Sequence, residues 1–141
     1  MTSPKRIAVI GQGVIGLTSA AKLLNEGHSV DIYSRENFDA TTSMAAGAYW
    51  WPHKAYPEVR VSRWSKETFD AYSEAQSRDG SGVHFEEHFR FCRDPDDSAY
   101  ARHLVEEWEA IDGASHGIPC HDAYRVVLPV IDVPVFMPNL K

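Results

Sequence analysis

A glycine-rich turn close to the N-terminus sets the fold that this chain can adopt. The turn, Gly11-Gln12-Gly13-Val14-Ile15-Gly16, matches the pattern G-x-G-x-x-G. The apolar run before it predicts a buried strand over 6–10, and the sequence after it predicts a helix over 14–25. Gly27 stands where a helix end favours a left-handed residue, and a second strand is expected over 29–34. This βαβ unit implies a parallel sheet with a right-handed crossover, and so an α/β fold.

Each glycine of the turn has its own physical reason. Gly11 permits the tight turn off the strand, Gly13 lets the backbone approach a diphosphate, and Gly16 allows close packing of helix on strand. The first helical turn, which contains Val14 and Ile15, offers unpaired N–H groups and a positive dipole end to an anion. The sequence therefore predicts a dinucleotide-binding turn. A turn without a ligand is the alternative, which the strand–turn–helix context disfavours.

An acidic residue follows at the spacing that such a turn requires. Glu36 lies 20 residues after Gly16, at the end of the second predicted strand. A carboxylate there can accept hydrogen bonds from an adenosine ribose. Arg35 beside it could stack on the adenine or contact the ribose. The acid favours a free 2′-hydroxyl, while Arg35 leaves recognition of a 2′-phosphate open.

A segment of hydroxyl-bearing and small residues comes next. The hydroxyls of Thr41-Thr42-Ser43 can donate to phosphate oxygens or to a ribityl chain. The stretch Ala45-Ala46-Gly47-Ala48 leaves backbone bare, so a flat ring can lie against it. Tyr49-Trp50-Trp51-Pro52 then adds aromatic bulk. Taken alone, an Ala-rich core loop anchored by tryptophans explains this segment equally well.

Together, the fingerprint, the acid, the Thr-Thr-Ser run and Ala-Gly-Ala-Tyr-Trp resemble the N-terminal region of the D-amino acid oxidase family, whose D-aspartate oxidases share the pattern. The resemblance is strongest over residues 6–52. It is looser around Trp64-Ser65-Lys66-Glu67-Thr68-Phe69 and Pro129-Val130-Ile131-Asp132-Val133-Pro134. It therefore spans the chain, with most of its specificity in the first third.

The resemblance implies an FAD-binding, Rossmann-like domain and a substrate domain with a mixed sheet. It implies that the glycine turn holds the diphosphate and Glu36 the ribose. Thr42 and Ser43 would contact phosphate, and the stretch from Ala45 to Ala48 would line one face of the isoalloxazine ring. The expected cofactor-binding residues are Gly11, Gly13, Val14, Ile15, Gly16, Arg35, Glu36, Thr41, Thr42, Ser43, Ala46, Gly47 and Ala48.

The reaction that the resemblance implies is oxidative deamination of D-amino acids to 2-oxo acids, ammonia and hydrogen peroxide. The expected partners are a D-amino acid, dioxygen and the remainder of the oxidase chain, and a homodimer is left open. In the family, the Arg that clamps the substrate carboxylate and the Tyr residues over the pocket lie farther along than Lys141. No catalytic residue is therefore assigned. The chain itself shows no evident acid–base or nucleophile constellation.

Past residue 36, helix-like and strand-like segments alternate. The expected segments are an irregular stretch over 37–57, helices over 62–76 and 99–111, a turn over 79–82, and strands over 83–92 and 124–133. The helix over 99–111 would follow an acidic loop that ends at an N-cap, Ser98, and would turn Leu104, Val105, Trp108 and Ile111 inward.

The domain boundary is expected after residue 60. Residues 1–60 would form the N-terminal part of the FAD-binding domain, and residues 61–141 the helices and the start of the substrate domain. Because residues 138–141 look like the first turn of a new helix, further sequence is expected beyond Lys141.

Charge and hydropathy exclude several other classes. The formal net charge of −6 disfavours nucleic acid as a partner. No apolar run approaches the roughly 20 residues of a membrane span, and the N-terminus lacks the features of a secretory signal. A soluble cytoplasmic protein is expected, or a peroxisomal one in a eukaryote. In that compartment Cys92 and Cys120 are expected to remain thiols.

Two histidine groups raise the question of a metal site. His84 and His88 are four residues apart, but on a predicted strand, where that spacing does not define a helical face. A denser group follows, and its side chains could ligate zinc: His116, Cys120, His121 and Asp122. The spacings C-x-x-C and H-E-x-x-H are both absent, so no metal is expected.

Three functional hypotheses follow from the sequence. The first is an FAD-dependent D-amino acid oxidase of which this chain supplies the FAD-binding half. The second is a glycine- or sarcosine-type amine oxidase of the wider superfamily. The third is a non-catalytic nucleotide-binding module that needs a partner chain.

Overall fold

The computed structural model describes residues 3–53, 55–95 and 99–141, and these form two compact units. The first unit comprises Met1–Ala48, Gly80–Gly82 and Asp132–Lys141, and the second comprises Tyr49–Asp79 and Val83–Ile131. The two units interleave, because the chain leaves the first unit after Ala48 and returns to it twice. The domain boundary expected after residue 60 stays a prediction.

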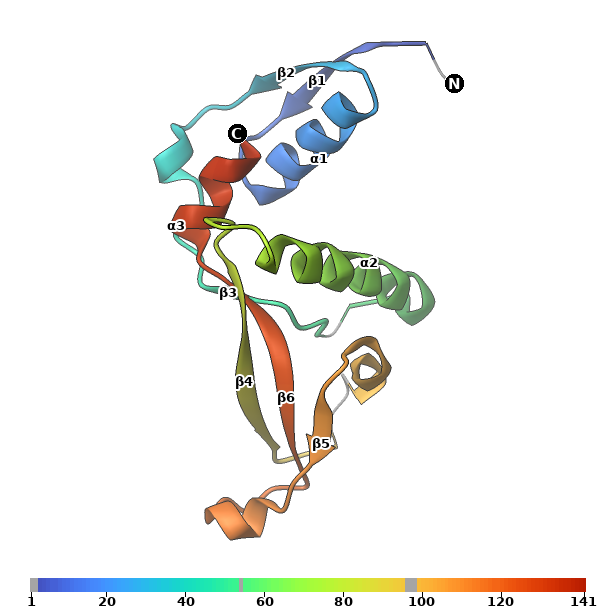
Figure 1. The fold of residues 1–141 in the computed structure, drawn as a ribbon, viewed down its shortest axis with the longest axis vertical. Coiled ribbons are helices and arrows are strands. Elements are labelled where there is room, and N and C mark those ends of the chain that lie inside the picture. Colours follow the sequence, from blue (N-terminus) through green and yellow to red (C-terminus); the bar gives the residue numbers. More distant parts are fainter. Residues whose placement is uncertain (1–2, 54, 96–98) are drawn as a thin grey trace. The chain divides into compact units, whose positions relative to one another are not determined.

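The first unit contains the predicted βαβ element. β1 (Arg6–Ile10) pairs in parallel with β2 (Ser29–Tyr33), and α1 (Val14–Asn25) connects them (Figure 1). The predictions for these three segments are confirmed, apart from the last residue of β2. Leu17 and Ala20 form the buried side of α1, each only 2% exposed. Gly27 has a φ of +85°, so the helix ends at a left-handed glycine as expected.

The C-terminal segment completes the first unit. α3 (Val133–Phe136) continues into a 3₁₀ helix, η4 (Met137–Leu140), in which Met137 is buried. Gly82 has a φ of +72°, and a Cβ there would lie 2.6 Å from the backbone nitrogen of Phe136. Two predictions are corrected here, since the strand expected over 124–133 ends at Ile131 and residues 138–140 continue a helical segment instead of opening one.

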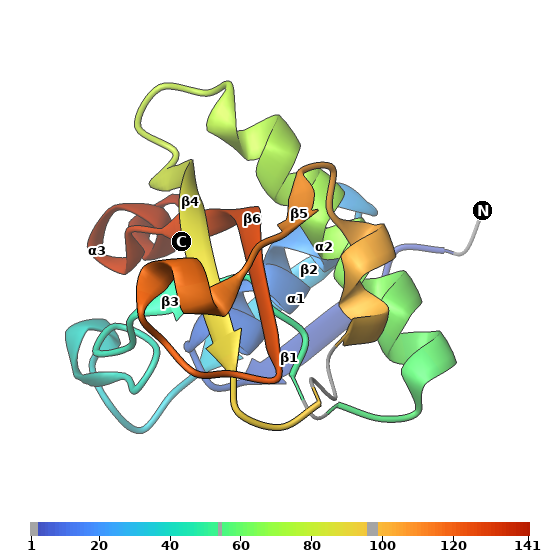
Figure 2. The same cartoon turned by 90° about the horizontal axis from the view of Figure 1, so that it is seen from below.

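The second unit is built on an antiparallel sheet. β4 (Val83–Cys92) pairs with β6 (Asp122–Ile131) along its whole length. β5 (Trp108–Ala110) also pairs with β6, and the two-residue β3 (Ala48–Tyr49) neighbours β6 in the strand order β3-β6-β4. Figures 1 and 2 both show β4 and β6 side by side, with β5 next to β6.

One face of β6 carries the core of the second unit. Tyr124, Val126 and Leu128 alternate along the strand, and each is 0% exposed. This period of two places the three side chains on one face of the sheet. They pack in one cluster with Phe69 of α2 (Glu58–Gln76), with Ala101 and Leu104 of a 3₁₀ helix, η2 (Ala99–Leu104), and with Trp50.

The helix predicted over 99–111 is wrong. This segment forms η2 and, after a short connection, β5. Trp108 packs against Tyr124 with ring centroids 5.5 Å apart and ring planes tilted by 40°, and the Arg102 guanidinium lies 4.4 Å from the Trp108 ring centroid. In a continuous helix, Arg102 and Trp108 would lie six residues apart and about 120° apart around the axis, on different faces. Pairing with the edge of β6 therefore outweighs the helical pattern.

Smaller differences concern element ends. α2 begins at Glu58, four residues before the predicted start. Of those four residues only Val61 is buried and Val59 is 85% exposed, so they show little of the apolar pattern that predicts a helix. The irregular stretch contains a 3₁₀ helix, η1 (Phe38–Ala40), and another, η3 (Gly113–His116), precedes β6. The N-cap predicted at Ser98 lies outside the described residues. Within the described ranges, no helix has the length and apolar character to cross a membrane.

Candidate functional site

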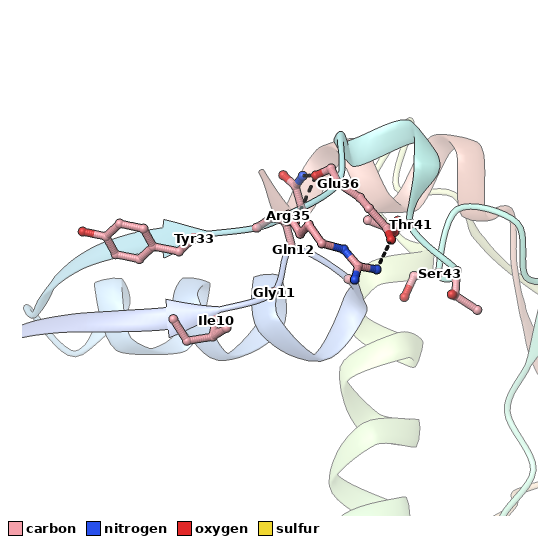
Figure 3. Close-up of a pocket in the computed structure, with 11 residues that line it drawn as sticks. Ile10, Gly11, Gln12, Tyr33, Arg35, Glu36, Thr41 and Ser43 are labelled. Atoms are coloured by element: carbon pink, nitrogen blue, oxygen red, sulfur yellow. Dashed lines mark hydrogen bonds and ion pairs between the residues drawn. The ribbon is translucent and has the colours of Figure 1, made fainter.

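The first unit has a pocket where β1 and β2 end, with a volume of about 450 Å³. That volume lies within the range of roughly 300–1,000 Å³ typical of small-molecule sites. Figure 3 shows side chains from the glycine turn, the end of β2 and the segment after η1 around this space. The lining residues are Ile10, Gly11, Gln12, Gly13, Tyr33, Ser34, Arg35, Glu36, Thr41, Thr42 and Ser43.

The turn that forms one side of the pocket needs two of its glycines for different reasons. Gly11 has a φ of +106°, a backbone conformation that residues other than glycine rarely adopt. Its N–H donates to the Tyr33 carbonyl at 2.7 Å. Gly16 faces Gly11, and a Cβ on Gly16 would lie 2.0 Å from the Gly11 carbonyl oxygen. Glycine is thus needed at position 11 for its backbone conformation, and at position 16 because the helix lies too close to the turn for a side chain.

The start of α1 presents backbone donors. The first four N–H groups of a helix have no intrahelical acceptor. The Val14 N–H donates to the Ser43 hydroxyl at 3.0 Å. In the part of the chain that the structure describes, the N–H groups of Ile15 and Gly16 have no protein acceptor. These two amides, together with the positive end of the helix dipole, are suited to an anion.

The acidic side of the pocket is held in place by its neighbours. The Arg35 guanidinium donates to the Glu36 carboxylate at 2.6 Å (Figure 3). The Gln12 side-chain amide and the Ser34 hydroxyl both donate to the Glu36 carbonyl. The side chain of Glu36 is 48% exposed, so its carboxylate can still reach a ligand. The ion pair with Arg35 keeps this end of the pocket close to neutral.

The predicted site residues fall into three groups. Seven of them line the pocket: Gly11, Gly13, Arg35, Glu36, Thr41, Thr42 and Ser43. Val14, Ile15 and Gly16 form the start of α1 beside it. Ala46, Gly47 and Ala48 do not line it. Whether any of these residues contacts a cofactor stays a prediction.

Four lining residues were not predicted from the sequence: Ile10, Gln12, Tyr33 and Ser34. Their position offers a signal that was overlooked. Ile10 and Tyr33 are the last residues of two paired parallel strands, and ligands of α/β sheets bind beyond the carboxyl ends of the strands. Gln12 occupies the first variable position of the glycine turn, where its side chain holds the end of β2.

The residues considered for a metal do not converge. His116 packs against the rings of Phe89 and Phe91, and His121 Nδ1 lies 3.3 Å from Asp122 Oδ2. Across the described ranges, no three His, Cys, Asp or Glu side chains form a group suited to a metal ion. Within the described residues, neither Cys92 nor Cys120 forms a disulfide.

Residues 6–127 match the family profile described as "FAD dependent oxidoreductase" (DAO). The chain is 34% identical to a D-amino-acid oxidase from Rubrobacter xylanophilus, over 96% of this chain and 42% of that protein. It is 39% identical to a D-amino-acid oxidase from Streptomyces coelicolor, over 52% of this chain and 23% of that protein. The chain thus spans about two fifths, or less, of the length of these relatives.

Solved structures include a similar fold. The crystal structure of a glycine oxidase from Bacillus cereus matches with a TM-score of 0.57 and 20% sequence identity, over 99% of this chain and 41% of that chain. At this identity the match concerns the fold. It agrees with the α/β architecture described above.

Proposed function

Because the chain belongs to the family of FAD-dependent oxidoreductases, we propose that it forms the FAD-binding part of an oxidase that converts D-amino acids to 2-oxo acids, ammonia and hydrogen peroxide. The pocket at the start of α1 carries the proposal, because it combines a dinucleotide-binding glycine turn with a ribose-type acid. The similarity to D-amino-acid oxidases supports the substrate class. FAD held by these residues would supply the redox chemistry of the proposed reaction, namely hydride acceptance from the substrate α-carbon and transfer of the electrons to dioxygen.

The residues of the pocket fit the ADP end of FAD. The free amides of Ile15 and Gly16, at the start of α1 beside the pocket, match the acceptor oxygens of a diphosphate. Glu36 offers a carboxylate for ribose hydroxyls. A volume of about 450 Å³ is sufficient for part of such a ligand.

The remaining predicted residues have roles in this proposal that follow from their chemistry. The hydroxyls of Thr41 and Thr42 donate to phosphate or ribityl oxygens. Ala46, Gly47 and Ala48 present backbone to the isoalloxazine ring. Substrate positioning is left to residues beyond this chain, within the rest of the oxidase. A homodimer and a cytoplasmic or, in a eukaryote, peroxisomal location belong to the same proposal.

A glycine- or sarcosine-type amine oxidase is the second candidate, and the fold of the Bacillus cereus glycine oxidase favours it. A peroxide assay on the natural full-length protein with FAD separates the two. We expect peroxide from D-amino acids, and little from glycine, sarcosine or L-amino acids. Peroxide from glycine and sarcosine alone would support the second candidate. FAD binding without peroxide from any of these amines would support a non-catalytic module that needs a partner chain.

Changing Glu36 to glutamine is expected to weaken FAD binding about 10-fold, because hydrogen bonds to a charged acceptor contribute about 1.5 kcal/mol or more. The measurement is a flavin fluorescence titration of the full-length protein. Glu26→Gln is the matched control. Glu26 is exposed at the end of α1, so this substitution removes the same charge outside the pocket. Equal affinities of the two variants would contradict a ribose-binding role for Glu36.

A further inference from the structure

The second glycine of the turn has a backbone that does not require glycine. Gly13 is the N-cap of α1, with φ −76° and ψ 179°, which is extended backbone that any residue adopts. The reason for glycine at this position is therefore space. The common explanation is that a dinucleotide approaches the backbone here. The structure contains a second reason, within the protein itself.

A Cβ on Gly13 would meet a side chain from 30 residues away. Its nearest neighbours would be the Ser43 hydroxyl oxygen at 2.9 Å and the Ser43 Cβ at 3.8 Å, with nothing else within 4 Å. The first distance is too short for a carbon beside that oxygen, and the second is an ordinary contact. The space above Gly13 is therefore occupied by one atom, Ser43 Oγ.

That oxygen serves as the cap of α1. Gly13 has no side chain to cap the helix, and the Val14 N–H donates to Ser43 Oγ at 3.0 Å. A serine at the N-cap normally accepts from the second or third N–H of the helix. Here Ser43 Oγ accepts from the first, that of Val14, and the bond joins two segments 29 residues apart in sequence.

The segment that supplies this cap is folded tightly around Ser43. Thr41 is buried, and its carbonyl and its hydroxyl both accept from the Met44 N–H. The Ser43 carbonyl accepts from the Ala46 N–H at 3.3 Å. These local bonds connect Thr41, Ser43, Met44 and Ala46 to one another, so a bond from Ser43 to α1 ties the whole segment to the start of the helix. The hydroxyl proton of Ser43 is not used by the Val14 bond and is free to donate.

We propose that Gly13 and Ser43 are a matched pair, in which the missing side chain at 13 makes room for the Ser43 hydroxyl to cap α1 and to fix segment 41–46 beside the glycine turn before any cofactor binds. Ser43 is then a positioning residue. Its effect on FAD rests on the proposed function, but its effect on the protein without FAD does not.

The test is a double-mutant cycle of Gly13→Ala and Ser43→Ala on the full-length protein without FAD. Each single variant is expected to lower Tm by about 2–8 °C, because each removes the same cap. The double variant is expected to melt no lower than either single variant, since without Oγ the new Cβ has an ordinary 3.8 Å neighbour. Ser43→Thr keeps a hydroxyl and is expected to recover most of the Tm. Ser3→Ala is the control, because Ser3 is exposed, lies outside the pocket and makes the same serine-to-alanine change.

Two outcomes overturn the pairing. If Gly13→Ala leaves the Tm without FAD unchanged, the glycine is needed only for the ligand. If the two decreases in Tm add, Gly13 acts independently of Ser43. A flavin titration of the same variants adds a second measurement, in which Ser43→Ala is expected to bind FAD about 5-fold more weakly and to shift the visible flavin spectrum, with recovery in Ser43→Thr. If no variant and not even the natural protein binds FAD, the proposed function fails, while the melting cycle still decides the pairing.

Discussion

Replacing Gly16 with alanine is expected to abolish measurable FAD binding and to destabilise the first unit by about 3 kcal/mol or more, above the middle of the range for overpacking. The added Cβ would lie 2.0 Å from the Gly11 carbonyl oxygen and 2.9 Å from the Gly11 carbonyl carbon. Both are backbone atoms, so no side-chain rotation relieves the overlap. The helix start must move away from the turn, which separates the free amides of α1 from the other side of the pocket.

The measurement is urea unfolding of the full-length protein without FAD, followed by a flavin titration. Gly47→Ala is the matched control for stability, because a Cβ on Gly47 would meet nothing within 4 Å and its φ is not positive. We expect that control to unfold within about 0.5 kcal/mol of the natural protein. Near-normal stability and FAD affinity of Gly16→Ala would show that the close approach of α1 to the turn is not needed.

Replacing Tyr124 with alanine is expected to destabilise the second unit by about 3–5 kcal/mol, as for other buried aromatic residues. Tyr124 is fully buried and packs against two tryptophans, with ring centroids 6.0 Å from Trp51 and 5.5 Å from Trp108. The guanidinium carbons of Arg90 and Arg102 lie 4.7 Å and 4.4 Å from the centroids of Trp51 and Trp108, and 5.9 Å and 5.7 Å from that of Tyr124. Removing the Tyr124 ring leaves a cavity and takes away the surface against which both tryptophans pack.

Chemical denaturation with near-ultraviolet circular dichroism measures this effect, because the signal arises from the ordered aromatic cluster. Tyr56→Ala is the control, since Tyr56 is 71% exposed and its loss is expected to change stability by about 0.5 kcal/mol or less. Tyr124→Phe, which keeps the ring, is expected to retain most of the stability. Similar denaturation midpoints for Tyr124→Ala and Tyr56→Ala would refute the role assigned to this cluster.

Much of the site could be predicted because its signals are local. The strand, turn, helix and strand of residues 6–33 each follow from patterns of a few residues, and the acid at Glu36 follows from a spacing. Gly11 and Gly16 were assigned steric roles from the motif, and the structure shows the positive φ of one and the close contact of the other. Seven of the predicted residues consequently meet around one pocket.

The failures concern residues whose partners are distant in the chain. Residues 99–111 have a helical pattern, yet β5 forms because β6 offers an edge with unpaired backbone groups, and because Trp108 gains a packing partner in Tyr124. No pattern within the segment encodes that edge. The return of residues 132–141 to the first unit likewise has no local signal in the sequence.

The amino-acid sequence alone determined the βαβ element, the family resemblance and the identity of the residues around the glycine turn, because these depend on steric and hydrogen-bonding properties of neighbouring residues. Only the tertiary structure decided that Ser43 caps α1 above Gly13, and that β6 carries strands on both edges. Such contacts depend on surfaces that exist only after distant segments have folded, so no local pattern specifies them.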